Sequence, residues 1–154
     1  MDKKAFTLIE LLVVVLIVGI LAAIALPQYQ RAVDLSRTKG TFPVIRAIVE
    51  AEKAFYMENG RYTKDFEELS IDFPVKSYKN GSLTLADGSV YSIGDNGTYW
   101  HVFAYPFGLN NMFIYWAIPR DWWLCYPQGA RGKNVCKALG CDDVEGSYCR
   151  FYLR

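Results

Sequence analysis

The 154-residue sequence has one histidine, His101, and neither an internal repeat nor a low-complexity tract. Its four cysteines include no C-x-x-C pair, the spacing that would favour a zinc site. Basic and acidic side chains almost balance, at 17 and 16, which argues against a strong general affinity for nucleic acid or acidic surfaces. No Ser, Cys or carboxylate constellation accompanies His101 at motif spacing, so we expect a packed or surface histidine and no enzyme activity or cofactor.

Charge is also nearly missing from Phe6–Leu26, the stretch around which the chain is organised. This run is almost entirely apolar and about as long as a membrane-spanning helix requires, roughly 20 residues. Its one charge is Glu10, and a carboxylate in hydrocarbon costs at least about 2.5 kcal/mol. The carboxylate therefore requires a partner or a function.

Two simple interpretations of this stretch remain open on physical grounds. A plain membrane anchor, with Lys3 and Lys4 holding the N-terminus in the cytoplasm, explains the length but not Glu10. A secretory signal peptide is suggested by the small residues Ala23 and Ala25, yet its apolar region usually runs only about 7–15 residues.

The residues KKA followed by FTLIELLVVVLIVGILAAIALPQYQ resemble the N-terminus of type IV pilins and the related pseudopilins. The resemblance implies cleavage by a prepilin peptidase between Ala5 and Phe6, and methylation of the new Phe6 amine. It assigns assembly roles to Glu10, Gly19 and Pro27. One departure is Ala5, because the family normally has glycine before the cut.

The resemblance also implies partners. These are further copies of the chain in a filament, a prepilin peptidase that is also the methylase, an inner-membrane assembly platform, an assembly ATPase and an outer-membrane secretin. The precursor is then expected in the inner membrane with its N-terminus in the cytoplasm, and the product in a surface pilus. A periplasmic pseudopilus of a type II secretion system is the alternative.

The residues themselves suggest how such a filament would form. Cleavage exposes an ammonium at Phe6, and this cation and the Glu10 carboxylate are each costly alone in low dielectric. Pairing the Glu10 of one subunit with the Phe6 amine of a neighbour favours one axial register, while Gly19 lets helix backbones approach closely. Removal of the leader leaves 15 basic and 15 acidic side chains, which suits dense packing of identical copies.

The apolar helix is predicted to continue to about Glu58 and to end at Asn59-Gly60. Its second half carries apolar residues at helical spacing, so we expect one face to be buried against a globular head. Pro27 is expected to bend the helix, and Gly40 with Pro43 predicts a kink or short break near 38–43. The predicted buried face consists of Val44, Ala47, Ile48, Ala51, Ala54 and Phe55.

After a loop with a short helix at Asp65–Leu69, capped by Asp65 and Glu68, the apolar pattern changes to alternation. Strands are predicted at 82–85, 89–93, 98–105, 112–118 and 122–126, the first two joined by a turn at Asp87-Gly88. The predicted fold class is α+β: a long N-terminal helix on a small antiparallel sheet, the pilin fold. Its parts are a leader (1–5), a transmembrane and filament-core helix (6–26), an amphipathic helix (27–60) and a globular head (61–154).

Four cysteines, Cys125, Cys136, Cys141 and Cys149, indicate disulfides and an oxidising compartment. Of the three pairings, we favour Cys125–Cys136 with Cys141–Cys149, since neighbouring pairs close short loops between turns. Four thiolates binding zinc is the rival interpretation. Three acidic residues in this segment are weak calcium candidates, against the alternative of a solvated acidic turn: Asp142, Asp143 and Glu145.

A last interpretation is a minor pilin that captures DNA or a surface. Basic residues lie close in sequence to aromatic ones, a combination that single-stranded nucleic acid favours, although the same aromatics also suit the core of a sheet. The basic residues are Arg120, Arg131, Lys133, Lys137, Arg150 and Arg154, and the aromatic ones are Trp122, Trp123 and Tyr126.

Overall fold

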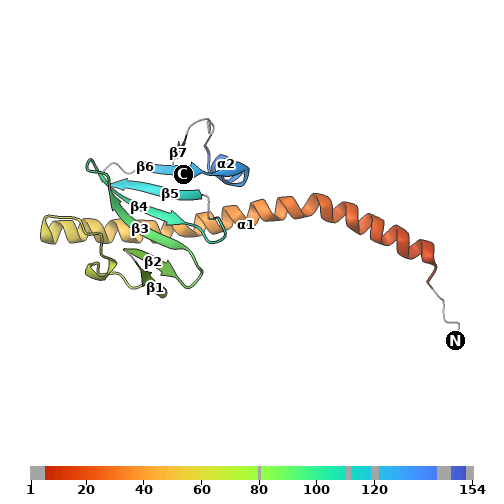
Figure 1. Ribbon diagram of the computed structural model, residues 1–154, viewed down its shortest axis with the longest axis horizontal. Coiled ribbons are helices and arrows are strands. Elements are labelled where there is room, and N and C mark those ends of the chain that lie inside the picture. Colours follow the sequence, from red (N-terminus) through yellow and green to blue (C-terminus); the bar gives the residue numbers. More distant parts are fainter. Residues whose placement is uncertain (1–5, 80, 110–111, 119–121, 142–146, 152–154) are drawn as a thin grey trace. The chain divides into compact units, whose positions relative to one another are not determined.

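The computed structural model describes residues 6–79, 81–109, 112–118, 122–141 and 147–151. The chain divides into two compact units, residues 1–33 and 34–154, and each is described by itself below. One helix, α1 (Leu8–Asn59), contributes to both (Figure 1). Its end is the predicted one: Gly60 adopts a left-handed φ of 71° and donates its N–H to the carbonyl of Tyr56 at 2.8 Å.

In the first unit, α1 is helical through Gly19 and Pro27. Leucine, valine, isoleucine and alanine side chains project from all sides of this part of the helix. Every described residue from Phe6 to Ala32 is exposed within this single chain. Of the described residues, this helix alone is long and apolar enough to cross a membrane, judged by length and composition.

In the second unit, α1 continues through Gly40 and Pro43 without interruption, so the short break predicted there is not formed. Pro43 removes one backbone hydrogen bond, to the carbonyl of Lys39, but both residues are exposed and water can hydrate that carbonyl. Phe42 and Ile45, which flank the proline, are buried and hold this turn to the head.

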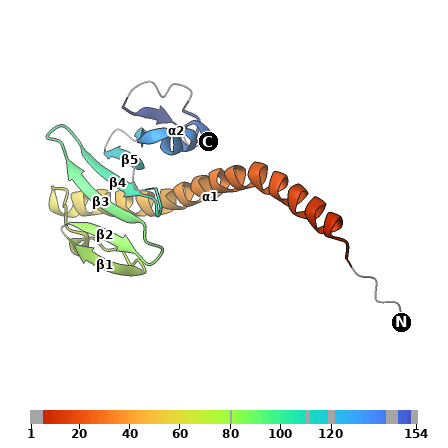
Figure 2. The same ribbon diagram turned by 45° about the vertical axis from the view of Figure 1, so that its right-hand side comes forward.

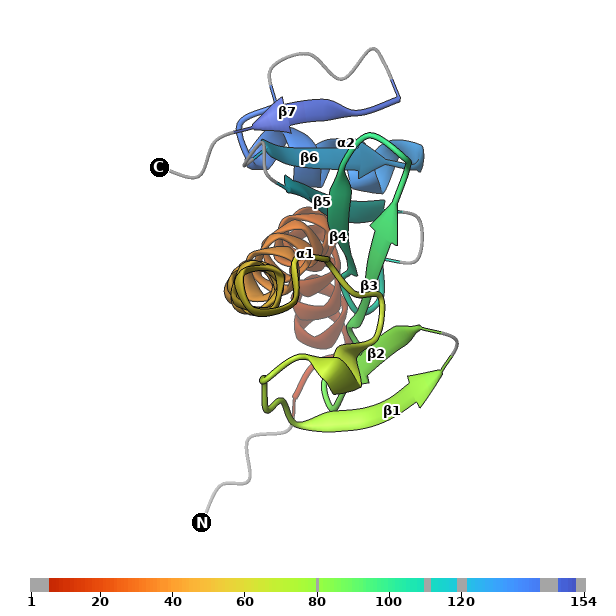
Figure 3. The same ribbon diagram turned by 90° about the vertical axis from the view of Figure 1, so that its left-hand side faces the viewer.

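The head contains a seven-stranded antiparallel sheet in which every strand pairs with its neighbour in sequence (Figures 1 and 3). The pattern predicted five strands, and the structure adds β1 and β7 together with helix α2 between β6 and β7. The elements are η1 (Phe66–Glu68), β1 (Val75–Lys79), β2 (Ser82–Leu85), β3 (Val90–Asp95), β4 (Trp100–Tyr105), β5 (Met112–Ile118), β6 (Trp122–Pro127), α2 (Gly129–Ala138) and β7 (Cys149–Phe151).

The predicted turn joins β2 and β3, and glycine is required in it. Gly88 has a φ of 85°, and a Cβ atom there would lie 2.6 Å from the ring of Phe107. Asp87 accepts the backbone N–H of Ser89 at 2.8 Å, which fixes the turn.

One face of the sheet covers the C-terminal part of α1 (Figure 2), and the core includes helix residues from Leu35 to Phe55. The buried residues of the helix are Asp34, Thr38, Thr41, Phe42, Ile45, Ile48, Val49 and Glu52. The predicted stripe is therefore wrong in part: Ala54 is exposed, because the sheet accepts the larger side chains one step around the helix. Phe42 forms the centre of an aromatic cluster, with its ring 4.9 Å from Trp123 and 5.9 Å from Phe151.

The short helix is η1, and its predicted reciprocal cap is half correct. Asp65 accepts the N–H of Glu67 at 3.0 Å, as a cap should. Glu68 does not bond back to the Asp65 N–H, which instead donates to Thr63 Oγ1, while the Glu68 carboxylate pairs with Arg61 at 3.0 Å.

Candidate functional site

The first turn of α1 holds the one carboxylate of the apolar stretch. The backbone N–H and the hydroxyl of Thr7 donate to Glu10 Oε2 at 2.8 and 2.6 Å, and the Glu10 N–H donates to Thr7 Oγ1 at 3.3 Å. This reciprocal arrangement is a capping box, for which T-x-x-E before an apolar run is the sequence signature. The sequence reasoning treated Glu10 only as a charge and missed this second role.

The surroundings of Glu10 are apolar. Phe6, Ile9, Val13 and Val14 line a shallow groove with Glu10 along the helix, and Phe6 itself is 78% exposed. The carboxylate thus lies at the N-terminal end of a fully exposed apolar surface, where the helix dipole also favours negative charge. Such a surface is stable only in lipid or against other apolar helices.

The other two predicted assembly residues, Gly19 and Pro27, fall on the same helix. Nothing lies within 4 Å of the position where a Gly19 Cβ would be, so this surface is open for a second backbone. Pro27 lies within the helix. Ala5 of the predicted cleavage site, like the whole leader 1–5, is outside the described residues.

The four cysteines lie close together around α2, at the edge of the sheet formed by β6 and β7. The structure joins Cys125 to Cys136 and Cys141 to Cys149, each pair with Cα atoms 5.8 Å apart. The first bond ties β6 to α2, and the second ties the end of α2 to β7. The calcium candidates Asp142, Asp143 and Glu145 lie outside the described residues.

Comparison with known proteins shows which proteins this chain resembles. The family model described as the prokaryotic N-terminal methylation motif matches residues 1–26. The chain is 39% identical over 69 residues to the type IV major pilin protein PilA of Myxococcus xanthus, covering 45% of this chain and 31% of that one. Over the aligned residues this chain is similar to type IV pilins. It is also similar to the fimbrial protein EcpC of Eikenella corrodens (38% over 88 residues; 56% and 58% covered) and the type IV major alpha-pilin of Moraxella bovis (35% over 103 residues; 62% and 64%).

The fold agrees with this similarity: a long apolar N-terminal helix packed on an antiparallel sheet, with a disulfide-bonded C-terminal region, is the α+β pilin fold. The aligned part of this chain spans about a third to two thirds of the length of these three pilins. No solved structure is significantly similar to the chain.

Two buried carboxylates of the pilin-like head were not predicted. The first is Asp34 of α1, 2% exposed, which accepts two hydrogen bonds of 2.6 Å from the guanidinium of Arg131 in α2. The hydrogen bonds to Asp34 raise the pKa of Arg131. This forked pair joins the start of the head's helix to the disulfide-bonded α2, 97 positions later in sequence, and no local spacing predicts it.

The second is Glu52, which is completely buried where α1 meets the loop after it. Glu52 Oε2 accepts the backbone N–H of Thr63 at 3.2 Å, while Oε1 has no hydrogen-bond partner among the described residues. Burial raises the pKa of Glu52 to about 7; the Thr63 hydrogen bond opposes this, and the nearby charges of Glu68 and Arg61 raise and lower it respectively.

The raised pKa of Glu52 predicts a pH-dependent stability. In the folded chain Glu52 keeps its proton up to about pH 7, whereas in the unfolded chain it loses it near the ordinary value of 4.5. Its contribution is therefore full below pH 4.5 and is lost as the pH rises to 7, by roughly 1–3 kcal/mol. Urea unfolding of the full chain and of Glu52→Gln across this range is expected to show a difference that grows with pH in favour of the variant. A difference that does not change with pH would contradict the assignment.

The basic and aromatic residues that suggested DNA capture do not form one surface. Trp123 faces the core against Phe42, and Arg131 is engaged by Asp34. Arg150 lies on the opposite face of the sheet, with its guanidinium carbon 3.9 Å from the ring centre of Trp122. Arg120 and Arg154 are outside the described residues.

That outward face carries a second, smaller apolar cluster. Leu124 is buried there among partly buried aromatic side chains of β4, β6 and the turn before β4, namely Tyr99, Phe103, Trp122 and Tyr126. His101, also in β4, is 6% exposed, and its ring lies edge-on to that of Phe103 at 4.4 Å. Burial lowers the pKa of His101, which favours its neutral form. Of the two environments predicted for it, packed or on the surface, the structure shows the packed one.

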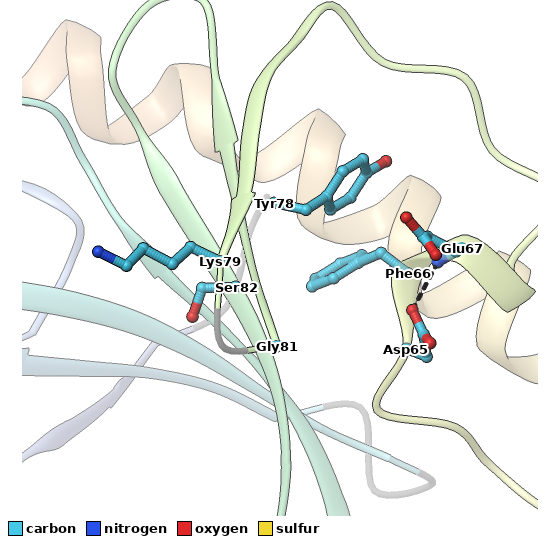
Figure 4. Close-up of a pocket in the computed structure, with 7 residues that line it drawn as sticks. All are labelled: Asp65, Phe66, Glu67, Tyr78, Lys79, Gly81 and Ser82. Atoms are coloured by element: carbon cyan, nitrogen blue, oxygen red, sulfur yellow. Dashed lines mark hydrogen bonds between the residues drawn. The ribbon is translucent and has the colours of Figure 1, made fainter.

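A small cleft opens between η1 and the β1–β2 hairpin (Figure 4). The rings of Phe66 and Tyr78 form one wall, with centroids 6.5 Å apart, and Asp65 and Lys79 lie at its rim. Its volume is about 160 Å³, well below the roughly 300 Å³ at which small-molecule pockets begin. We assign it no ligand.

Proposed function

We propose that this chain is a structural subunit of a type IV pilus, made as a single-pass inner-membrane precursor. Prepilin peptidase would cut between Ala5 and Phe6, methylate the Phe6 amine, and leave a helix that polymerises. The observation that carries this proposal is the first unit: an entirely exposed apolar helix with one carboxylate, Glu10, in its first turn, covered by the methylation-motif match.

The electrostatics support assembly through this helix. In the single chain Glu10 is held by Thr7, so the carboxylate is positioned at the helix start before any partner arrives. The Phe6 ammonium of a neighbouring subunit would neutralise this carboxylate. Neither charge would then remain unpaired in the low-dielectric filament core. The exposed apolar side chains would exchange lipid contacts for helix contacts, with Gly19 allowing close approach.

The head would face outward and have no active site of its own. Extension and retraction would be driven by the assembly ATPase at the inner-membrane platform, and the fibre would leave through the outer-membrane secretin. The lysines before the span would keep the N-terminus in the cytoplasm. Adhesion, twitching motility and DNA uptake are the roles such a fibre would support.

The test is microscopy of sheared surface material from cells with and without the chain. A pilus subunit predicts long fibres that contain the chain and disappear with it. Short periplasmic filaments in place of surface fibres would instead support the pseudopilin of a type II secretion system.

A second candidate, a minor pilin that binds DNA, is favoured by one observation: the exposed Arg150 guanidinium stacked on Trp122 on the outward face. Arg131, one of the basic residues that suggested DNA capture, is a poor choice for a test because it holds Asp34. Arg150→Ala is the better test. Loss of DNA uptake with normal fibres would support DNA binding, and unchanged uptake would exclude it.

A further inference from the structure

Three of the four cysteine sulfurs form one buried cluster, and the fourth is bonded to one of them. The Sγ atoms of Cys125, Cys136 and Cys149 lie within 4.8 Å of one another, and Cys141 is bonded to Cys149. None of the four residues is more than 7% exposed. The sulfur of Cys149 in the second disulfide therefore lies within 4.8 Å of both sulfurs of the first disulfide.

The strand register gives Cys125 a second eligible partner. Cys125 of β6 and Cys149 of β7 are directly opposite each other, and Cys149 Sγ lies 3.7 Å from the Cys125 carbonyl oxygen. Opposed residues of antiparallel strands have Cα atoms about 4.5–5.5 Å apart. This separation lies inside the range of about 4.4–6.8 Å that disulfides span.

The end of α2 gives Cys136 a second partner as well. Gly140 has a φ of 97°, its N–H donates to Lys137, and the Cys141 N–H donates to the Cys136 carbonyl at 3.1 Å. These two bonds form a Schellman motif, in which a contact between the side chains at the positions of Cys136 and Cys141 is common. Both alternative pairs, Cys125–Cys149 and Cys136–Cys141, are thus set beside each other by the backbone.

We propose that the two disulfides exchange within the folded head. A small-molecule thiol opens Cys125–Cys136, forming a mixed disulfide on Cys136 and releasing the Cys125 thiolate. That thiolate attacks Cys149 Sγ: the Cys125–Cys149 bond forms, the Cys141–Cys149 bond breaks, and Cys141 leaves as a thiolate. Cys141 then attacks Cys136, forms Cys136–Cys141 and expels the small thiol, so no net oxidation or reduction occurs.

Exchange would change what the disulfides hold. In the structure, Cys125–Cys136 ties β6 to α2. After exchange, Cys125–Cys149 would tie β6 to β7, and Cys136–Cys141 would close only the last turn of α2. The helix would then be held to the head by packing and by the Arg131–Asp34 pair alone. The exchange is thus a thiol-triggered release of the covalent tether on α2.

The direct test uses Cys136→Ser in the full-length chain in detergent. This variant leaves a Cys125 thiol beside the intact Cys141–Cys149 bond, so the middle step needs no added thiol. After incubation at pH 8.5, quenching with acid and alkylation, we expect the label to be divided between Cys125 and Cys141. Cys125→Ser, the matched variant, is expected to divide label between Cys136 and Cys149. The double variant Cys125→Ser/Cys136→Ser is the control and should take no label.

Peptide mapping can distinguish these outcomes. Arg131, Lys133 and Lys137 place Cys125, Cys136 and the last two cysteines on different tryptic peptides, and Glu145 allows Cys141 to be separated from Cys149. Label confined to Cys125 in the first variant and to Cys136 in the second would overturn the proposal. Should either variant misfold, wild-type chain treated with substoichiometric dithiothreitol replaces it. Cys125–Cys149 peptides before full reduction would support exchange, and their absence would refute it.

Discussion

Glu10→Ala is expected to reduce filament yield at least about tenfold while leaving membrane insertion of the precursor unchanged. Alanine is cheaper than glutamate in hydrocarbon by about 2.5 kcal/mol or more, so the span inserts at least as well. The neighbour's Phe6 ammonium, however, loses its counter-charge in the filament core, and a loss of only about 1.4 kcal/mol per contact is already tenfold. The measurement is the fraction of chain in sheared fibres against the fraction in the membrane.

Two control variants separate the charge of Glu10 from its capping role. Glu10→Gln keeps an oxygen that can accept the Thr7 hydrogen bonds but removes the charge, so it should fail to assemble as Glu10→Ala does. Thr7→Val removes the hydroxyl of the cap and keeps the charge, at a cost of about 1 kcal/mol in helix stability, and should still assemble. Assembly by Glu10→Gln together with failure of Thr7→Val would show that the cap, not the charge pair, is what matters.

Arg131→Ala is expected to destabilise the head by about 2–3 kcal/mol, more than Asp34→Asn does. The two partners are unequal: the Asp34 side chain is 3% exposed and that of Arg131 is 59% exposed. Without Arg131, a buried carboxylate loses both of its 2.6 Å hydrogen bonds to the guanidinium, whereas without the Asp34 charge the arginine returns to water. This loss is smaller than the roughly 3–5 kcal/mol for a fully buried pair, because Arg131 itself is solvated.

Urea unfolding of the full-length chain in detergent measures this effect. Lys133→Ala, an exposed cation on the same helix, is the matched control and should change stability by no more than about 0.5 kcal/mol. The double variant Asp34→Asn/Arg131→Ala should be no less stable than Arg131→Ala, since the uncompensated charge is then absent. Equal losses for Arg131→Ala and Lys133→Ala would contradict the role given to the pair.

The parts of the fold that were predictable depend on local patterns. The apolar run at 6–26, the helix stop at Asn59-Gly60 and the alternation of β2 to β6 each follow from residues close together in sequence. The strand β1 was missed because most of it is exposed, so it shows no apolar alternation. The helix α2 was missed because it begins at a glycine, contains a second one, and has no side-chain cap; tertiary contacts hold it instead.

The site was predictable to the extent that it is local. Glu10 stands out as a charge in an apolar run, and T-x-x-E would also have indicated the cap. Asp34 and Glu52 gave no such indication, because Arg131 and Thr63 reach them only through the tertiary fold. The arrangement of the cysteines around one cluster depends on the register of β6 with β7, which a short, three-residue strand does not reveal in sequence.

The central claim is that Phe6 becomes a methylated N-terminus that the Glu10 of the next copy neutralises in a filament. It is tested most directly by the mass of the N-terminal peptide of the chain recovered from sheared surface material. The account predicts a peptide that starts with N-methylated Phe6 and lacks residues 1–5. Chain that retains Met1–Ala5 wherever it is found in the cell, and never appears in the sheared fraction, would contradict it.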